Sequence, residues 1–179
     1  MAESTDKDER INPAITYAVK AGKEITPEDI AGIENMAEEA VTTFNTLKHQ
    51  GKIPNSVDFG PTTHIFAYKA LKNPNSDFCA AFAYDNGHVV GYRIIPIKKE
   101  TRGISSSYLG VAITHQRRGI ASKLVTETHK KLVEMGIRSY ETIAVAEVLE
   151  LYKKAGVEFT VLEPPGSYHT EGYKINVTL

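Results

Sequence analysis

The sequence predicts a single α/β domain of the mixed α+β kind, in which helices flank a central sheet. Its 179 residues match the length of one ordinary domain that can bury a core. Segments with strand and helix periodicity alternate along the chain, and most are bounded by glycine, proline or a capping residue. An Asn-Gly pair between two apolar runs indicates a hairpin, so at least part of the sheet is expected to be antiparallel.

The N-terminal segment predicts a tail followed by a strand. Residues 1–12 are polar and mostly acidic, so we expect them to be disordered and the domain to span 13–179. The alternating, β-branched run ITYAV at 15–19 then predicts the first strand.

A long helix is predicted next. Thr26 suits the N-cap, Pro27 suits the first helical position, and Asp29 would lie near the positive end of the helix dipole. Apolar residues recur at helical spacing from 30 to 47, and Gly51 is expected at the C-cap.

The middle of the chain predicts strands and a less regular segment. Residues 52–75 contain several prolines and predict loops around HIFAYKAL, which fits either a strand or a short helix. The runs 78–84 and 89–97 predict strands joined by a turn that contains Asn86-Gly87, and 107–113 predicts another strand.

The C-terminal part holds the clearest helix of the sequence, at 119–135, with Gly136 as its cap. The remaining segments predict a strand at 139–145, a short helix at 148–155, and strands at 158–162 and 173–178.

Composition excludes several classes of protein. The net charge of −1 argues against general nucleic-acid binding. The single cysteine, Cys79, excludes an internal disulfide framework and fits a buried apolar position. No apolar run approaches the ~18 residues of a membrane span, and the N-terminus does not resemble a signal peptide. We therefore expect a cytoplasmic protein without membrane association, and no cluster of residues has the spacing of a metal site.

The segment VAITHQRRGIAS at 111–122 predicts an anion site, because an apolar run leads through a basic turn into a helix. The first N–H groups of a helix have no partner within it, and the dipole adds positive charge there. Gly119 permits close backbone approach and unusual dihedrals, and Ala121 is small. Arg117 and Arg118 add charge that suits a di- or triphosphate group.

Here the chain resembles the GNAT superfamily, the Gcn5-related N-acetyltransferases. Gln116, Gly119 and Ala121 occupy the fixed positions of the family's Q/R-x-x-G-x-G/A signature, which holds the pyrophosphate of acetyl-CoA. Downstream, LYKKAGVEF at 151–159 is similar to the family's L-Y-E-K-x-G-F segment. The resemblance covers roughly residues 78–178 and covers the first half only loosely.

The resemblance implies a central mixed, largely antiparallel sheet that is splayed between its fourth and fifth strands. In this chain those strands would be 107–113 and 139–145, and the acyl-CoA would enter between them. Val111, Ala112 and Ile113 would bind the pantetheine arm like an added strand, and one of their N–H groups would face the thioester oxygen.

The resemblance also assigns the remaining cofactor contacts to one loop and helix start. These residues are Gln116, Arg117, Arg118, Gly119, Ile120, Ala121 and Ser122. Each arginine could instead be an ordinary solvated charge, so the backbone around Gly119 is the firmer part of the assignment.

Two residues are candidates for catalysis. Tyr152 matches the family tyrosine that protonates the leaving thiolate, although a tyrosine on a helix can equally pack its ring in the core. Glu141 is the carboxylate nearest the region where relatives place a general base, and an exposed strand charge is its alternative reading. Val145 stands where the family commonly has a cofactor-binding asparagine. His115 and His169 lie in turns, where a lone histidine is usually structural.

In this fold the acceptor pocket is built from the first helix and two loops. The corresponding residues are Glu34, Glu38, Glu39, Phe44, the 52–75 segment and 164–173. The glutamates could attract a cationic amine, or they could form a solvated helix face.

The sequence thus predicts an N-acetyltransferase that moves an acetyl group from acetyl-CoA to a primary amine by direct attack in a ternary complex, without a metal. The acceptor could be a small amine, a protein amine or aminoacyl-tRNA, and a longer acyl donor or a homodimer remains open. The alternative is a non-catalytic acyl-CoA-binding module of the same fold.

Overall fold

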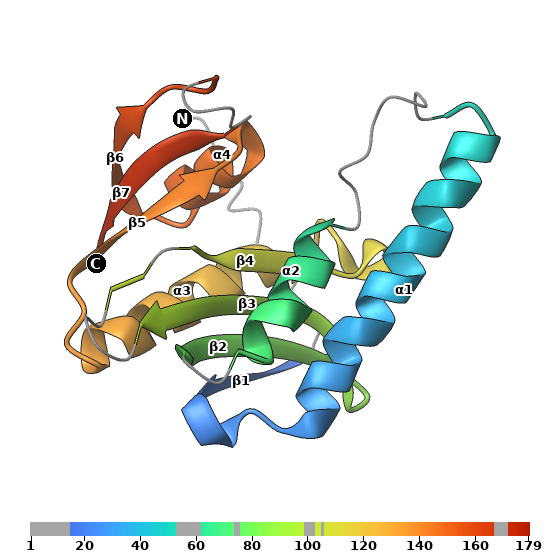
Figure 1. The fold of residues 1–179 in the computed structure, drawn as a ribbon, viewed down its shortest axis with the longest axis horizontal. Helices are drawn as coiled ribbons and strands as arrows, with labels where there is room; N and C mark the ends of the chain where they lie inside the picture. The colour runs from blue at the N-terminus through green and yellow to red at the C-terminus, as the bar shows by residue number, and fades with distance from the viewer. Residues whose placement is uncertain (1–14, 53–61, 74–75, 99–102, 105, 167–171) are drawn as a thin grey trace, which may run out of the picture.

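A computed structural model describes residues 15–52, 62–73, 76–98, 103–104, 106–166 and 172–179. The predicted tail at 1–12, most of the loop that begins at 52, and His169 lie outside the described residues. The elements that follow are arranged as two sheets with helices packed against them (Figure 1).

The first sheet is an antiparallel meander in the order β1-β2-β3-β4. Its strands are β1 (Ile15–Ala21), β2 (Ser76–Asp85), β3 (His88–Lys98) and β4 (Tyr108–Val111). Asn86 and Gly87 join β2 to β3 with φ of 49° and 82°, the left-handed conformation that a tight hairpin requires. The predicted hairpin is confirmed.

The second sheet is antiparallel and has the order β5-β7-β6. Its strands are β5 (Ser139–Ala144), β6 (Glu158–Glu163) and β7 (Tyr173–Thr178). Buried and exposed residues alternate along β5, because one face of this sheet packs on the core and the other meets solvent.

The two sheets separate between β4 and β5. In the described part of the chain no ladder joins these strands. A side-chain contact of 3.3 Å between Ser107 Oγ and Thr142 Oγ1 connects them at the end where β4 begins. The predicted fold class, with its split between the fourth and fifth strands, is confirmed.

Helices cover both faces of the first sheet (Figure 1). The helices are α1 (Pro27–His49), α2 (Thr62–Leu71), α3 (Ile120–Glu134) and α4 (Ala146–Lys154). The pair α1 and α2 lies on one face, α3 lies on the other, and α4 packs beside the second sheet. Strand β2 is therefore buried on both sides, which explains why its sequence is apolar without alternation.

The start of α1 follows the prediction closely. Thr26 is the N-cap and forms a capping box with Asp29, whose carboxylate also accepts hydrogen bonds from Lys20 Nζ and the Tyr84 hydroxyl, both at 2.6 Å. Burial alone would raise the pKa of Asp29, but these hydrogen bonds outweigh it and hold the pKa below its usual range.

Several element boundaries differ from the predictions. HIFAYKAL, for which a strand and a short helix were both open, lies in helix α2. Strand β4 ends at Val111, because the chain turns at Ala112 into a 3₁₀ turn at Ile113–His115. Strand β5 ends at Ala144, and Val145 is the N-cap of α4. Gln50 is the C-cap of α1, and Gly51 follows it with a φ of 66°.

None of the helices in the described residues combines the length and apolar content that crossing a membrane requires. Cys79 is buried in the core, as its sequence context predicted.

Candidate functional site

The loop between β4 and α3 is held in an unusual backbone conformation. Arg117 and Gly119 both have positive φ, at 60° and 76°. Gln116 Nε2 donates a hydrogen bond of 3.3 Å to the carbonyl oxygen of Val111, which ties the loop to the end of β4. The left-handed Gly119 is the N-cap of α3, so the chain enters the helix through the residue that the motif requires.

The N-terminus of α3 is an open set of donors. The first hydrogen bond of the helix runs from Lys123 N to Gly119 O at 3.1 Å. The N–H groups of residues 120–122 precede that bond, so they have no acceptor within the helix, and no side chain caps it. Together with the helix dipole and the exposed arginines of the loop, these donors are suited to an anion.

A cleft of about 410 Å³ lies in front of these donors. Its lining combines the loop and the start of α3 with the edge of β4 and the end of α4. The lining residues are Leu109, Gly110, Val111, His115, Gln116, Arg117, Gly119, Ile120, Ala121, Ser122, Leu151 and Lys154. Of the predicted loop residues Arg118 alone is missing from this lining, and the side chain of Ile120 is buried in the core, so Ile120 can offer only its backbone.

Only one of the three predicted β4 residues presents its backbone to the split. Val111 pairs with Gly91 across the ladder, and the next residue, Ala112, donates its N–H to Val90 O at 2.9 Å. Because backbone groups alternate along an antiparallel strand, the N–H of Val111 points away from β3, toward the open edge. The N–H of Ala112 is already hydrogen-bonded to β3, and Ile113 belongs to the 3₁₀ turn, so neither offers the predicted strand contact.

A second cavity, of about 200 Å³, lies between α1, α2 and the end of β4. It shares Val111 and Gln116 with the cleft, so the two spaces meet at the end of β4. Its walls are mainly apolar, and its lining residues are Met36, Glu39, Ala40, Thr43, Phe44, Leu47, His64, Val111, Ala112, Ile113 and Gln116. The structure thus brings Glu39 and Phe44 of the predicted acceptor residues to this cavity, and Glu34 and Glu38 do not line it.

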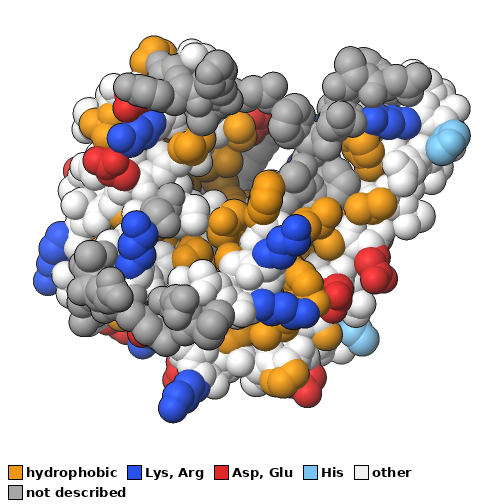
Figure 2. Space-filling model, in the orientation of Figure 1, with side chains coloured by type: hydrophobic (Ala, Val, Ile, Leu, Met, Phe, Trp, Pro, Cys, Tyr) orange, Lys and Arg blue, Asp and Glu red, His pale blue; other side chains and the backbone are white. Residues whose placement is uncertain are grey.

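The face of the molecule that carries α1 and α2 is hollowed between these helices and the second sheet, and hydrophobic side chains gather around the hollow (Figure 2). Large apolar side chains exposed on these elements include Phe66 of α2 and Ile143 of β5. Exposed apolar surface of this kind is typical of binding sites, because a ligand that covers it removes it from water.

His64 is a residue that the sequence analysis did not single out. Its Nδ1 lies 2.9 Å from the hydroxyl of Tyr92, which is fully buried on β3. Burial lowers the pKa of His64, so its imidazole is neutral at pH 7. In the sequence His64 is the first residue of HIFAYKAL. Because that segment fits a strand or a helix equally well, the sequence does not show which way the histidine faces.

Tyr152 lies in the core. Its hydroxyl accepts a hydrogen bond of 2.8 Å from Arg93 Nη2 and lies 3.4 Å from the Tyr140 hydroxyl. Tyr152 is 1% exposed and is not among the residues that line the cleft, where its neighbour Leu151 stands instead. Its predicted role toward a leaving thiolate stays a prediction.

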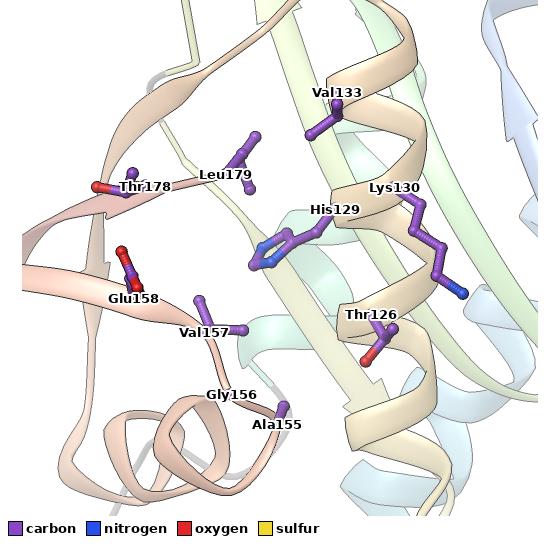
Figure 3. A pocket seen from close by; sticks show the side chains of 10 residues that line it. All are labelled: Thr126, His129, Lys130, Val133, Ala155, Gly156, Val157, Glu158, Thr178 and Leu179. Carbon is purple, nitrogen blue, oxygen red and sulfur yellow. The ribbon is translucent and has the colours of Figure 1, made fainter.

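His129 continues this cluster toward a third cavity. Its Nε2 lies 2.9 Å from the Tyr140 hydroxyl, and burial followed by the charge of Arg93 lowers the pKa of His129 to about 3. The cavity, of about 610 Å³, lies between α3, the end of α4 and Leu179 (Figure 3). The ring of His129 points from α3 into the cavity. The side chain of Lys130, on the same helix, points out of it (Figure 3). Among its lining residues Gly156 lies in the turn that follows α4, and none of them lies at the start of a helix, so this cavity does not offer the donors of the cleft.

The other residues considered in the sequence have polar partners of their own. Glu141 is exposed on β5, and its Oε2 lies 3.2 Å from Lys174 Nζ. His115 contacts Thr114 with one ring nitrogen and Asp85 with the other, at 2.9 and 3.0 Å.

Residues 76–158 match the sequence model of a family described as the acetyltransferase (GNAT) domain. Over these residues, which make up slightly less than half of the chain, the sequence is similar to a GNAT domain. The match runs from β2 to the start of β6 and therefore includes the anion loop, the split and α4. The resemblance stated on the sequence motifs is confirmed.

Solved structures share the fold of this chain at low sequence identity. A protein from Desulfovibrio desulfuricans assigned to the GNAT family of acetyltransferases is 18% identical, with a TM-score of 0.62 over 93% of this chain and 98% of that one. The PaiA N-acetyltransferase of Thermoplasma acidophilum, in complex with coenzyme A, is 14% identical with a TM-score of 0.58 over 90% and 99%. The ribosomal-protein-S18-alanine N-acetyltransferase of Escherichia coli is 12% identical, with a TM-score of 0.54 over 90% of both chains.

No curated protein sequence matches the chain. At these identities the solved structures show that the chain has the GNAT fold, and its chemistry has to be argued from its own residues.

Proposed function

We propose that the chain is an acetyl-CoA-dependent N-acetyltransferase, which transfers an acetyl group to a primary amine by direct attack in a ternary complex. The observation that carries the proposal is the meeting of two spaces at the end of β4. One contains an anion site at the start of α3, and the other is an apolar cavity with one carboxylate, from Glu39. A donor with a phosphate-bearing end and an acceptor amine could therefore approach the same point from two sides.

The residues of the loop fit the pyrophosphate of CoA. The N–H groups at the start of α3 would donate to its oxygens, and the conformation of Gly119 leaves open space where a β-carbon would stand. Arg117 lines the cleft from the loop and Lys154 from the end of α4, and both would add positive charge.

The open edge of β4 fits the pantetheine arm. An extended chain with amide groups can add to a strand edge through backbone hydrogen bonds, and Val111 offers its N–H there, while its carbonyl oxygen already accepts from Gln116 Nε2. Bound acetyl-CoA would supply an activated thioester. The N–H of Val111 would then stabilise negative charge on the carbonyl oxygen, provided that oxygen lies within about 3 Å of it.

The second cavity fits the acceptor. A cationic amine would be attracted by Glu39, while the apolar walls favour a carbon chain or an apolar side chain next to the amine. Its volume of about 200 Å³ suits a small amine or the end of a larger molecule, so small amines and protein amines both remain candidates. The proposal includes a cytoplasmic location and allows a homodimer.

The experiment is a thiol-release assay with acetyl-CoA, or a longer acyl-CoA, across a panel of small amines, peptides with free N-termini and aminoacyl-tRNA. We expect amine-dependent release of CoA thiol. CoA binding measured by calorimetry without release on any acceptor would contradict the proposal. It would favour the non-catalytic binding module, a reading that the enclosed hydroxyl of Tyr152 supports.

A further inference from the structure

We propose that His64 removes the proton from the acceptor amine, with Nδ1–H donating to the Tyr92 hydroxyl and Nε2 accepting the amine proton. This inference rests on the proposed function, because it names the base of that reaction. The imidazole lies in the wall of the cavity that meets the cleft at the end of β4.

The position of His64 is fixed from β3. Tyr92 pairs with Gly110 of β4, and a β-carbon at Gly110 would lie only 2.7 Å from the Tyr92 hydroxyl oxygen. The hydroxyl that contacts His64 thus lies directly over the residue before Val111. The hydrogen bond of 2.9 Å and an edge-to-face ring contact of 5.6 Å hold the imidazole against this point.

The charges around His64 allow it to act as a base at neutral pH. Tyr92 faces it from β3, Tyr108 of β4 belongs to the same apolar cluster, and Glu39 of α1 is the one carboxylate in the lining of the cavity. Tyr68 lies further along α2, and it contacts Lys72, which follows the end of that helix. Burial lowers the pKa of His64 and raises that of Tyr92, so the imidazole is neutral and the phenol stays protonated.

The proposed step is balanced. The cationic amine first loses one proton to solvent. The neutral amine nitrogen then attacks the thioester carbonyl carbon, a second proton passes from it to His64 Nε2, and the carbon–sulfur bond breaks. The sulfur leaves as a thiolate that takes a proton from water, and the imidazolium returns its proton to solvent. In the imidazolium both ring nitrogens donate, so the bond from Nδ1 to the Tyr92 oxygen strengthens as the charge forms.

The other histidines near the site are less suited to this role. Both ring nitrogens of His115 have partners, in Thr114 and Asp85. His129 is committed to Tyr140 and lines a different cavity. Only one ring nitrogen of His64 has a partner among the recorded contacts of the described residues.

The test compares His64→Gln and His64→Asn with His49→Gln, an exposed histidine of α1 outside the cavity. Asn can keep a hydrogen bond near the Nδ1 position, so His64→Asn is expected to fold normally. Neither amide can take up a proton. We expect kcat/KM to fall about 10²- to 10⁴-fold in both His64 variants and to be unchanged in His49→Gln. CoA affinity should be unchanged in all three.

The pH profile separates a base from a structural residue. Ionisation of the amine affects every variant equally, so it cancels in the ratio of wild-type to His64→Gln kcat/KM. Because the neutral imidazole is the active form, this ratio should be constant above neutral pH and fall about tenfold per pH unit below the lowered pKa of His64.

A ratio that does not change with pH, or full activity in both His64 variants, would overturn the inference. Absence of thiol release by the wild-type protein would instead refute the proposed function, so the two failures are distinguishable.

Discussion

At the scale of single residues, the buried guanidinium of Arg93 organises the region around Tyr152. Arg93 is 1% exposed, and its recorded hydrogen bonds within the described residues go to the hydroxyls of Tyr140 and Tyr152 and to Val125 O. A buried cation without a carboxylate partner is unfavourable, so these oxygens stabilise its charge in place of water. The enclosed position of Tyr152 is therefore explained by a structural role.

The first prediction compares Tyr152→Phe with Tyr140→Phe. Each removes one phenolic acceptor of the same guanidinium, so each should lower the free energy of unfolding by about 1.5–3 kcal/mol. Since the hydroxyl of Tyr152 is enclosed, we expect thiol release by the two variants to agree within a few-fold. Denaturant unfolding and the release assay measure the two effects.

Tyr140→Phe is the control for the loss of a hydrogen bond to Arg93; because it also removes the contact with His129 Nε2, its loss of stability should be at least as large. A loss of thiol release confined to Tyr152→Phe, with CoA affinity unchanged, would contradict the structural role and restore the tyrosine as the acid for the leaving thiolate.

At the scale of elements, the two ends of α3 have the same local conformation and different surroundings. Gly119 precedes the helix and Gly136 follows it, with φ of 76° and 82°, and neither has an atom within 4 Å of an added β-carbon. Gly119 lines the cleft and Gly136 does not. Substitutions at these two glycines therefore distinguish the effect of backbone strain, which both share, from an effect on ligand binding, which only Gly119 should show.

The second prediction uses this pair. Gly119→Ala and Gly136→Ala should each cost about 1–2 kcal/mol of stability, because both place an L-residue in the left-handed region. Only Gly119→Ala should also weaken CoA binding, by about tenfold or about 1.4 kcal/mol, because its methyl group would enter the cleft. Calorimetric titration with CoA measures it, and equal affinity in the two variants would refute the loop assignment.

Sequence and structure agree least where an element ends. The capping box of α1 and the Asn-Gly hairpin were predictable, because each depends on residues adjacent in sequence. The end of β4 was not, because the apolar residues Ala112 and Ile113 continue the strand pattern while the chain turns to meet α3. Only the ladder with β3 decides which N–H of the three faces the split.

At the scale of the whole molecule, the split between the sheets is the feature that a ligand would stabilise. The sheets are joined at the Ser107–Thr142 contact and by the packing of α3 and α4 against a shared core. Strand edges without a ladder partner expose backbone groups, so β4 and β5 should open more readily than strands inside a sheet.

The third prediction is that CoA protects the two sides of the split together. At a CoA concentration of about 100 Kd, binding adds about 2.7 kcal/mol, so amides that exchange through opening of the site should slow about a hundredfold. We expect this in residues 109–124 and in β5, measured by hydrogen exchange. The edge strand β6, away from the split, serves as the control and should keep its local exchange rate. Protection confined to α3, with β4 and β5 unchanged, would contradict binding within the split.

The sequence by itself determined the features that depend on neighbouring residues. The alternation of strands and helices, the caps, the hairpin turn and the glycine that opens α3 could all be predicted from it, because dihedral preferences and unsatisfied helix termini are local properties. The tertiary structure decided what distant segments do together. It buried Tyr152 against Arg93, separated Glu39 from Glu34 and Glu38, and brought His64 to the end of β4 through Tyr92. Such contacts join residues far apart in the chain, and packing selects them among many arrangements that the local pattern allows.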